Sequence, residues 1–142
     1  MAVILELVDA VVAVLNAGTL GQPVSATRQY QPRFELPELT ELHVTVIPKS
    51  VTVTQIARNR AAKDYQIDIG VQRKFEAGDA AAIDALMDLT EEIAGLFEFQ
   101  PLAGYPDAVW IRTEYPTLFA PEHLERLGQF TGVVTLTFRA VR

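Results

Sequence analysis

The sequence predicts an α+β fold, in which two main helices pack on an antiparallel or mixed sheet of about six strands with a long protruding hairpin. Two observations carry this prediction: a long polar and apolar alternation over residues 64–75, and helical periodicity over residues 2–17 and 79–97. The length of 142 residues suits one domain, residues 1–142, with a core that needs no further cross-link.

The strand at residues 64–75 has the clearest pattern. Its apolar positions alternate with polar ones and are Tyr65, Ile67, Ile69, Val71 and Phe75. At ~3.3 Å per residue this strand would be ~40 Å long, whereas the expected radius of gyration of the domain is only ~14 to 15 Å. We therefore expect part of its hairpin to project from the core and to contact another subunit.

The first helix, residues 2–17, is apolar around most of its circumference. Ile4, Val8, Val11 and Leu15 form one stripe, which is widened by Leu5, Leu7, Val12 and Val14. A helix of this kind is buried on more than one side, either by its own sheet and a loop or by a neighbouring subunit. Leu7 and Val14 are our candidates for a contact with a neighbour.

The middle of the chain predicts strands at residues 24–31, 42–47 and 51–56, with Pro48 ending the second. Residues 31–41 are acidic and contain Pro32 and Pro37, which predicts a surface loop. The hairpin between the third strand and residues 64–75 has residues 57–63 as its predicted tip.

The second helix is predicted from an N-cap at Asp79 to about Phe97, and strands are predicted at residues 108–115 and 129–141. The expected core face of this helix consists of Ile83, Leu86, Met87, Ile93 and Phe97. Its carboxylates Asp84, Asp88, Glu91 and Glu92 are expected to face water.

Composition excludes several classes of function. The chain contains no cysteine, so it has neither disulfides nor thiolate metal ligands, as fits a reducing cytoplasm. Its first residues lack the basic segment of a secretory signal, and we expect neither export nor membrane insertion. The net charge of −6 argues against a protein that coats DNA, because such domains carry a basic face.

Residues for catalysis are scarce. His43 and His123 are the only histidines, and neither has metal-ligating residues at a suitable spacing. Paired carboxylates such as Glu91 and Glu92 are explained by a solvated helix face. We therefore expect no enzymatic activity, and we name no catalytic, cofactor-binding or metal-binding residue.

The basic cluster Arg58, Arg60 and Lys63 is the charge feature that suggests a contact. It is either a solvated hairpin turn or a contact between subunits, in which arginines bind carboxylates of a neighbour. The candidate carboxylates lie in the acidic segment and are Glu35, Glu38 and Glu41. A role in binding DNA is weaker, because three cations make few phosphate contacts.

Six blocks of sequence carry a resemblance, and they are residues 32–36, 42–48, 58–60, 64–69, 83–87 and 129–131. Together these blocks resemble small neck and tail-completion proteins of long-tailed bacteriophages and prophages, and the tail terminators most of all. The resemblance covers most of the chain and consists of structural patterns without catalytic signatures.

The resemblance implies a structural subunit of the virion, assembled in the host cytoplasm, that forms a homohexameric ring on the head-proximal end of the tail tube. Such a ring stops tube polymerisation and joins the tail to the head through the connector or stopper protein. DNA would pass through its lumen without specific binding. A head-completion or stopper protein, and a minor tail or tube-like protein of the same particle, remain alternatives.

Overall fold

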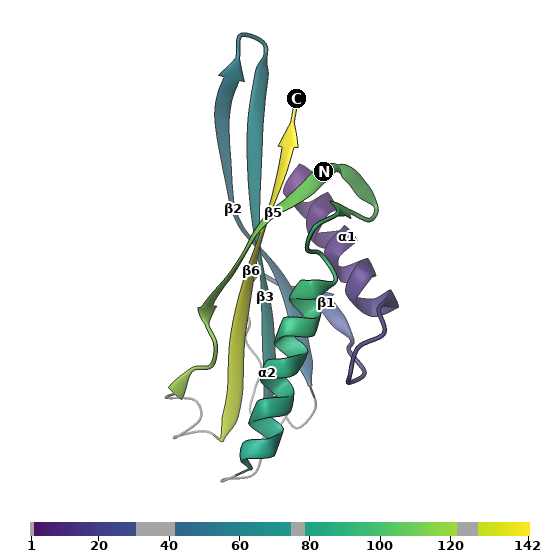
Figure 1. Ribbon diagram of the computed structural model, residues 1–142, viewed down its shortest axis with the longest axis vertical. Helices are drawn as coiled ribbons and strands as arrows, with labels where there is room; N and C mark the ends of the chain where they lie inside the picture. Colours follow the sequence, from purple (N-terminus) through teal and green to yellow (C-terminus); the bar gives the residue numbers. More distant parts are fainter. Residues whose placement is uncertain (1, 31–41, 75–78, 122–127) are drawn as a thin grey trace.

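The computed structural model describes residues 2–30, 42–74, 79–121 and 128–142 (Figure 1). These residues form two helices, α1 (Val3–Ala17) and α2 (Ala80–Gly95), and one six-stranded mixed sheet. The strands are β1 (Ala26–Arg28), β2 (His43–Ala57), β3 (Arg60–Lys74), β4 (Pro101–Leu102), β5 (Tyr105–Thr117) and β6 (Gln129–Val141). The α+β class predicted from the sequence is confirmed.

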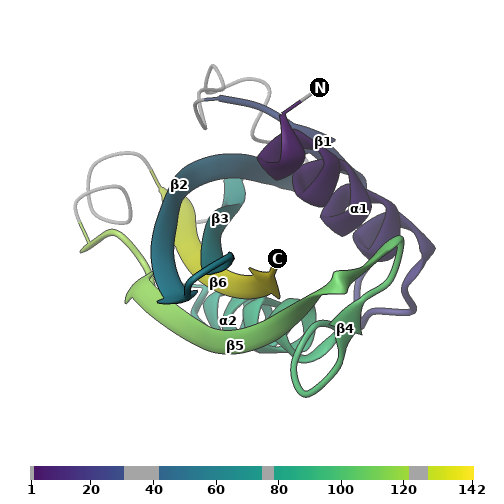
Figure 2. The same cartoon turned by 90° about the horizontal axis from the view of Figure 1, so that it is seen from above.

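The strand order in the sheet is β1-β2-β3-β6-β5-β4. β1 runs parallel to β2, and all other neighbouring strands are antiparallel. β6 therefore lies between β3 and β5, although it follows both of them in the sequence. The sheet is strongly curled, as the view from above shows (Figure 2).

One face of the sheet is apolar, because successive side chains of a strand point to opposite faces. On β3 this face carries Ile67 and Ile69, which lie opposite Leu136 and Val134 of β6. These side chains form one buried cluster with residues of both helices, among them Val11 of α1 and several residues of α2. The other face of the same strands carries polar residues.

Both helices begin and end close to their predicted positions. Asp79 caps α2, and its side chain accepts a hydrogen bond from the backbone N–H of Ala82 at 3.1 Å. The predicted carboxylates of α2 are exposed, whereas Leu86, Ile93 and Phe97 are buried. No helix within the described ranges is both long and apolar enough to cross a membrane.

The structure corrects the prediction for Leu7, which is fully buried within its own subunit beside Val8, Val11 and Leu15. It is therefore part of the core and is not available to a neighbour. The apolar stripe of α1 is covered from two sides, because the curled sheet and the chain after α2 both contact this helix. Ile4, predicted as core, is only partly buried against the same cluster.

The structure also corrects the prediction that Pro48 ends a strand. β2 runs through Pro48 without a break, and the register shifts by one residue between Pro48 and Ser50. Proline is tolerated on edge strands and at bulges, because the backbone N–H at such a position is not needed for a hydrogen bond to a neighbouring strand. Pro48 meets both conditions, because β1 pairs only with residues 44–46 of β2.

The hairpin turn is shorter than predicted. Ala57 pairs with Arg60, which leaves a two-residue turn of Arg58 and Asn59. Residues 61–63, predicted as part of the tip, belong to β3, and Ala61 exchanges two backbone hydrogen bonds with Arg142 at 2.7 and 3.0 Å. β3 therefore has neighbours on both sides almost to the turn.

Candidate functional site

The end of the β2–β3 hairpin carries the predicted basic residues. Arg58 and Arg60 are exposed, and neither forms an ion pair with any acidic residue that the structure describes. Lys63 is half-buried in the paired part of β3, opposite Val53, and so does not belong to the turn. Two of the three predicted cations thus lie at the outermost point of the hairpin.

Exposed apolar side chains precede these cations along β2. Val51, Val53 and Ile56 of β2 are exposed, with Val53 retaining 60% of its surface. Val51 and Val53 lie two residues apart and share one face of the strand. We call the set Val51, Val53, Ile56, Arg58 and Arg60 the hairpin end.

The outer edge of β2 is open along the hairpin end. The last contact with the β1 segment is the hydrogen bond from the Gln29 N–H to the Val46 carbonyl at 3.1 Å. Beyond it, no strand in the described ranges pairs with the outer edge of β2. An unpaired strand edge is a template for association unless it is blocked.

A second candidate surface lies where α2 and its C-terminal extension meet β5. Met87, Thr90, Glu91, Tyr115 and Leu118 line a small pocket there. Partial burial raises the pKa of the Tyr115 phenol, and the nearby carboxylates of Glu98 and Glu91 raise it further. Glu91 lines the same pocket as Tyr115, and the negative charge of Glu98 acts on the same phenol.

Phe99 extends the same surface along β5. Among the described residues it is the only one other than glycine with a positive φ, 64°, and its side chain is 88% exposed. Its ring lies against that of Trp110, with a centroid separation of 4.8 Å. Such a backbone conformation costs about 1 to 3 kcal/mol. Burial of the ring within the subunit compensates for little of this cost, because the side chain is mostly exposed. We call Glu91, Glu98, Phe99, Tyr115 and Leu118, together with Trp110 against the Phe99 ring, the acidic-aromatic patch.

The stretch of chain that carries this patch is strongly acidic. Residues 80–121 contain seven carboxylates and one cation, Arg112. That cation pairs with Glu114 at 3.3 Å. Glu92, on the far side of α2 from Tyr115, accepts a hydrogen bond from the Gly21 N–H at 2.7 Å. Glu91 and Glu98 have no cationic partner within the described part of the chain.

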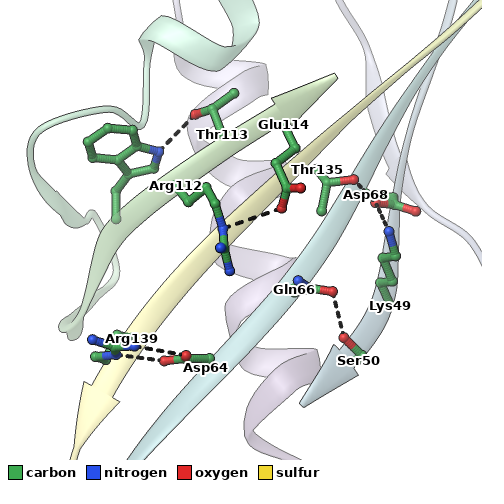
Figure 3. A network of polar contacts seen from close by, with 11 residues as sticks. Lys49, Ser50, Asp64, Gln66, Asp68, Arg112, Thr113, Glu114, Thr135 and Arg139 are labelled. Atoms are coloured by element: carbon green, nitrogen blue, oxygen red, sulfur yellow. Dashed lines mark hydrogen bonds and ion pairs between the residues drawn. The ribbon is translucent and has the colours of Figure 1, made fainter. Parts of the chain in front are cut away.

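The polar face of the sheet carries a network of compensated charges (Figure 3). Arg139 binds Asp64 through two hydrogen bonds of 2.7 and 3.0 Å. Asp68 accepts a hydrogen bond from the Thr135 hydroxyl at 2.6 Å and lies 3.9 Å from the Lys49 ammonium. Each cation drawn in this network has a carboxylate partner, so the network stabilises the sheet and leaves no free charge to attract a ligand.

Electrostatics within the network follow from its strongest pair. The hydrogen bond from Arg139 and its positive charge lower the pKa of Asp64, against the opposing effect of partial burial. The same contact raises the pKa of Arg139. Both groups are therefore held in their charged forms at neutral pH.

The remaining predicted residues are placed as follows. Glu35, Glu38 and Glu41 lie outside the described residues, as does His123, so their predicted contacts stay predictions. Val14 is half-buried beside Leu96 and Phe97. His43 is half-buried in β2. Within the described residues no three or more histidine or acidic side chains gather in a way that could hold a metal ion.

The comparisons with known proteins add no family. Neither the protein-family models nor the curated proteins include a match to this chain.

Sequence reasoning missed the acidic-aromatic patch. Its residues come from positions 91–99 and 110–118, which the fold brings together across α2 and β5. The near absence of cations from residues 80–121 was a readable signal of an acidic surface.

Proposed function

We propose that this protein is a structural component of a long-tailed phage or prophage particle that forms a ring on the head-proximal end of the tail tube. In this role it ends tube polymerisation and joins the tail to the head. Its partners are other copies of itself, in a homohexamer, together with the tail tube protein and the connector or stopper protein. Its location is the tail and neck of the virion.

The observation that carries the proposal is the hairpin end. It presents two cations without partners among the described residues and three exposed apolar side chains, next to an open strand edge. Such residues contribute little to the stability of one subunit, whereas they suit a contact between subunits. A ring closed by head-to-tail contacts needs two different surfaces on each copy.

The resemblance of the sequence blocks to tail terminators is the reason for proposing a ring on the tail tube and not another kind of oligomer. The net charge of −6 also suits a lumen through which DNA slides without specific binding. A stopper of the same neck, and a minor tail protein that polymerises along the tube, are the second candidates. The stopper differs from a terminator in the protein that it binds, and the minor tail protein differs in polymerising beyond a single ring.

Assembly of the purified protein tests the proposal. Light scattering and negative-stain images should reveal closed rings, either alone or on purified tail tubes, and added protein should stop tube growth. Filaments would favour the tube-like alternative. A ~16 kDa monomer that assembles under neither condition would refute the ring.

The double variant Arg58→Glu/Arg60→Glu tests the hairpin end within that experiment. We expect loss of rings with an unchanged circular dichroism spectrum, because both side chains are exposed. Arg73→Glu/Lys74→Glu is the matched control, since it makes the same charge change on exposed residues at the other end of β3. Rings of normal size from the first variant would show that the cluster is merely solvated.

A further inference from the structure

We infer that the hairpin end of one copy docks on the acidic-aromatic patch of the next copy. This inference rests on the proposed ring and names the two surfaces that would close it. The two surfaces are complementary in both charge and apolar character.

The charges of the two surfaces match. The hairpin end carries the guanidinium groups of Arg58 and Arg60, and the patch carries the carboxylates of Glu91 and Glu98. Arginine binds carboxylates through paired hydrogen bonds and also stacks on aromatic rings. Tyr115 lines one pocket with Glu91, and Phe99 follows Glu98 directly in the chain, so an aromatic ring is available next to each carboxylate for a bound guanidinium.

The apolar parts of the two surfaces also match. Val51, Val53 and Ile56 are exposed on the hairpin end, and Phe99, Tyr115 and Leu118 are exposed on the patch. Covering both sets removes apolar surface from water, which is the main favourable contribution at the centre of protein interfaces. Phe99 contacts the Trp110 ring on one side and remains 88% exposed, so a contact between copies would bury most of its surface.

The two surfaces make no ion pair with each other within one subunit. In Figure 1 the hairpin end lies at the top of the molecule, whereas α2 lies in the lower half. Two complementary and separate surfaces on one chain produce a head-to-tail contact, which closes into a ring when the rotation between copies permits. A second copy of the chain is therefore the occupant that we assign to the patch.

Reciprocal charge reversal tests the inference. Glu91→Lys/Glu98→Lys and Arg58→Glu/Arg60→Glu should each weaken self-association at least about tenfold, because each places like charges in contact. The variant with all four changes should recover association, since it restores opposite charges with their positions exchanged. Analytical ultracentrifugation at low and high salt measures all three.

A control variant changes two carboxylates earlier in α2. Asp84→Lys/Asp88→Lys makes the same charge change on exposed residues of the same helix that lie outside the acidic-aromatic patch, and Asp88 lines a different pocket with Gly21 and Glu92. We expect this variant to associate as the wild type does. Equal weakening by both helix variants would mean that only net charge matters, and would overturn the docking.

Phe99→Gly separates docking from folding. Glycine adopts a positive φ without strain, so the variant should melt at or above the wild-type temperature while associating more weakly. Normal association of this variant would show that Phe99 is not part of the contact between copies and would contradict the docking as proposed.

The failures of the two proposals are distinguishable. If the wild type forms rings and Glu91→Lys/Glu98→Lys forms them equally well, the docking is wrong and the ring stands. If that variant forms rings but no longer binds tail tubes, the patch serves the tube protein and the contact between copies is wrong. If the wild type forms no ring, alone or on tubes, both proposals fail.

Discussion

Arg139 of β6 and Asp64 of β3 lie directly opposite each other in the sheet and are joined by two hydrogen bonds, Nε to Oδ1 at 2.7 Å and Nη2 to Oδ2 at 3.0 Å. The pair connects the two central strands on the polar face. Because the arginine favours the ionised carboxylate, the pKa of Asp64 lies below its ordinary value of 3.8.

This pair predicts how stability depends on pH. A carboxyl with a lowered pKa in the folded state stabilises fully above its unfolded pKa, and the contribution is lost as the pH falls through the folded pKa. Asp64→Asn should therefore lower the free energy of unfolding by about 1 kcal/mol at pH 7. The difference from wild type should shrink below pH 3.8. Urea denaturation across this range measures both values.

The exposed pair of Arg112 and Glu114 provides the control for that measurement. Glu114→Gln should change the free energy of unfolding by less than about 0.5 kcal/mol at any pH. A constant difference between Asp64→Asn and wild type down to pH 2 would contradict the role given to the Asp64 carboxylate.

The burial of Leu7 predicts a large loss on truncation. Leu7→Ala should destabilise the subunit by about 3 kcal/mol, because it leaves a cavity in a fully buried site. Leu5→Ala makes the same chemical change on the same helix at a side chain outside the core cluster, and should cost about 1 kcal/mol or less. Denaturant unfolding of the two variants compares them directly. Equal losses would contradict the observed orientation of α1.

Two glycines predict opposite effects of an added methyl group. At Gly132 a Cβ would lie 2.9 Å from the Leu118 carbonyl oxygen and 3.0 Å from the Phe130 ring. Gly132→Ala should destabilise by about 1 to 3 kcal/mol, since backbone must shift. At Gly95, the last residue of α2, nothing lies within 4 Å. Gly95→Ala should stabilise by about 0.5 kcal/mol, and thermal melts of both variants decide the comparison.

The N-cap of α2 predicts a moderate effect. Asp79→Ala removes the acceptor of the Ala82 N–H and should cost about 1 kcal/mol, whereas Asp79→Ser should retain most of the stability. Asp84→Ala, at an exposed position in the same helix, should stay within about 0.5 kcal/mol of wild type. Loss of stability from Asp84→Ala equal to that from Asp79→Ala would show that the charge matters and the cap does not.

Elements with strong local signals were predictable from the sequence. Both helices have regular apolar spacing, Asp79 caps α2, and β6 alternates cleanly, so α1, α2 and β6 lie within two residues of their predicted bounds. Local signals failed where tertiary context decides the outcome. Pro48 reads as a strand end, yet it lies on an edge beside a bulge where no ladder bond is required.

The candidate site was only half predictable for the same reason. Arg58 and Arg60 lie within three positions of each other and were identified from the sequence. The approach of Phe99 to Trp110, and of Glu91 to Tyr115, depends on how α2 and the chain after it pack against β5. The prediction that Leu7 contacts a neighbour was wrong because periodicity shows which residues share a face of the helix. It does not show how much of the helix circumference the curled sheet covers.

The position of β6 in the sheet has a consequence for biosynthesis. β3 pairs along nearly its whole length with β6, from Lys74 opposite Gln129 to Ala62 opposite Val141. During translation β3 and the second helix are therefore complete long before the strand that covers the other edge of β3 has been made. Until then that edge remains unpaired beside Ile67 and Ile69, and an unpaired apolar strand edge is prone to intermolecular pairing. Yield of soluble protein should consequently depend on translation speed and chaperone supply more than on the stability of the finished fold.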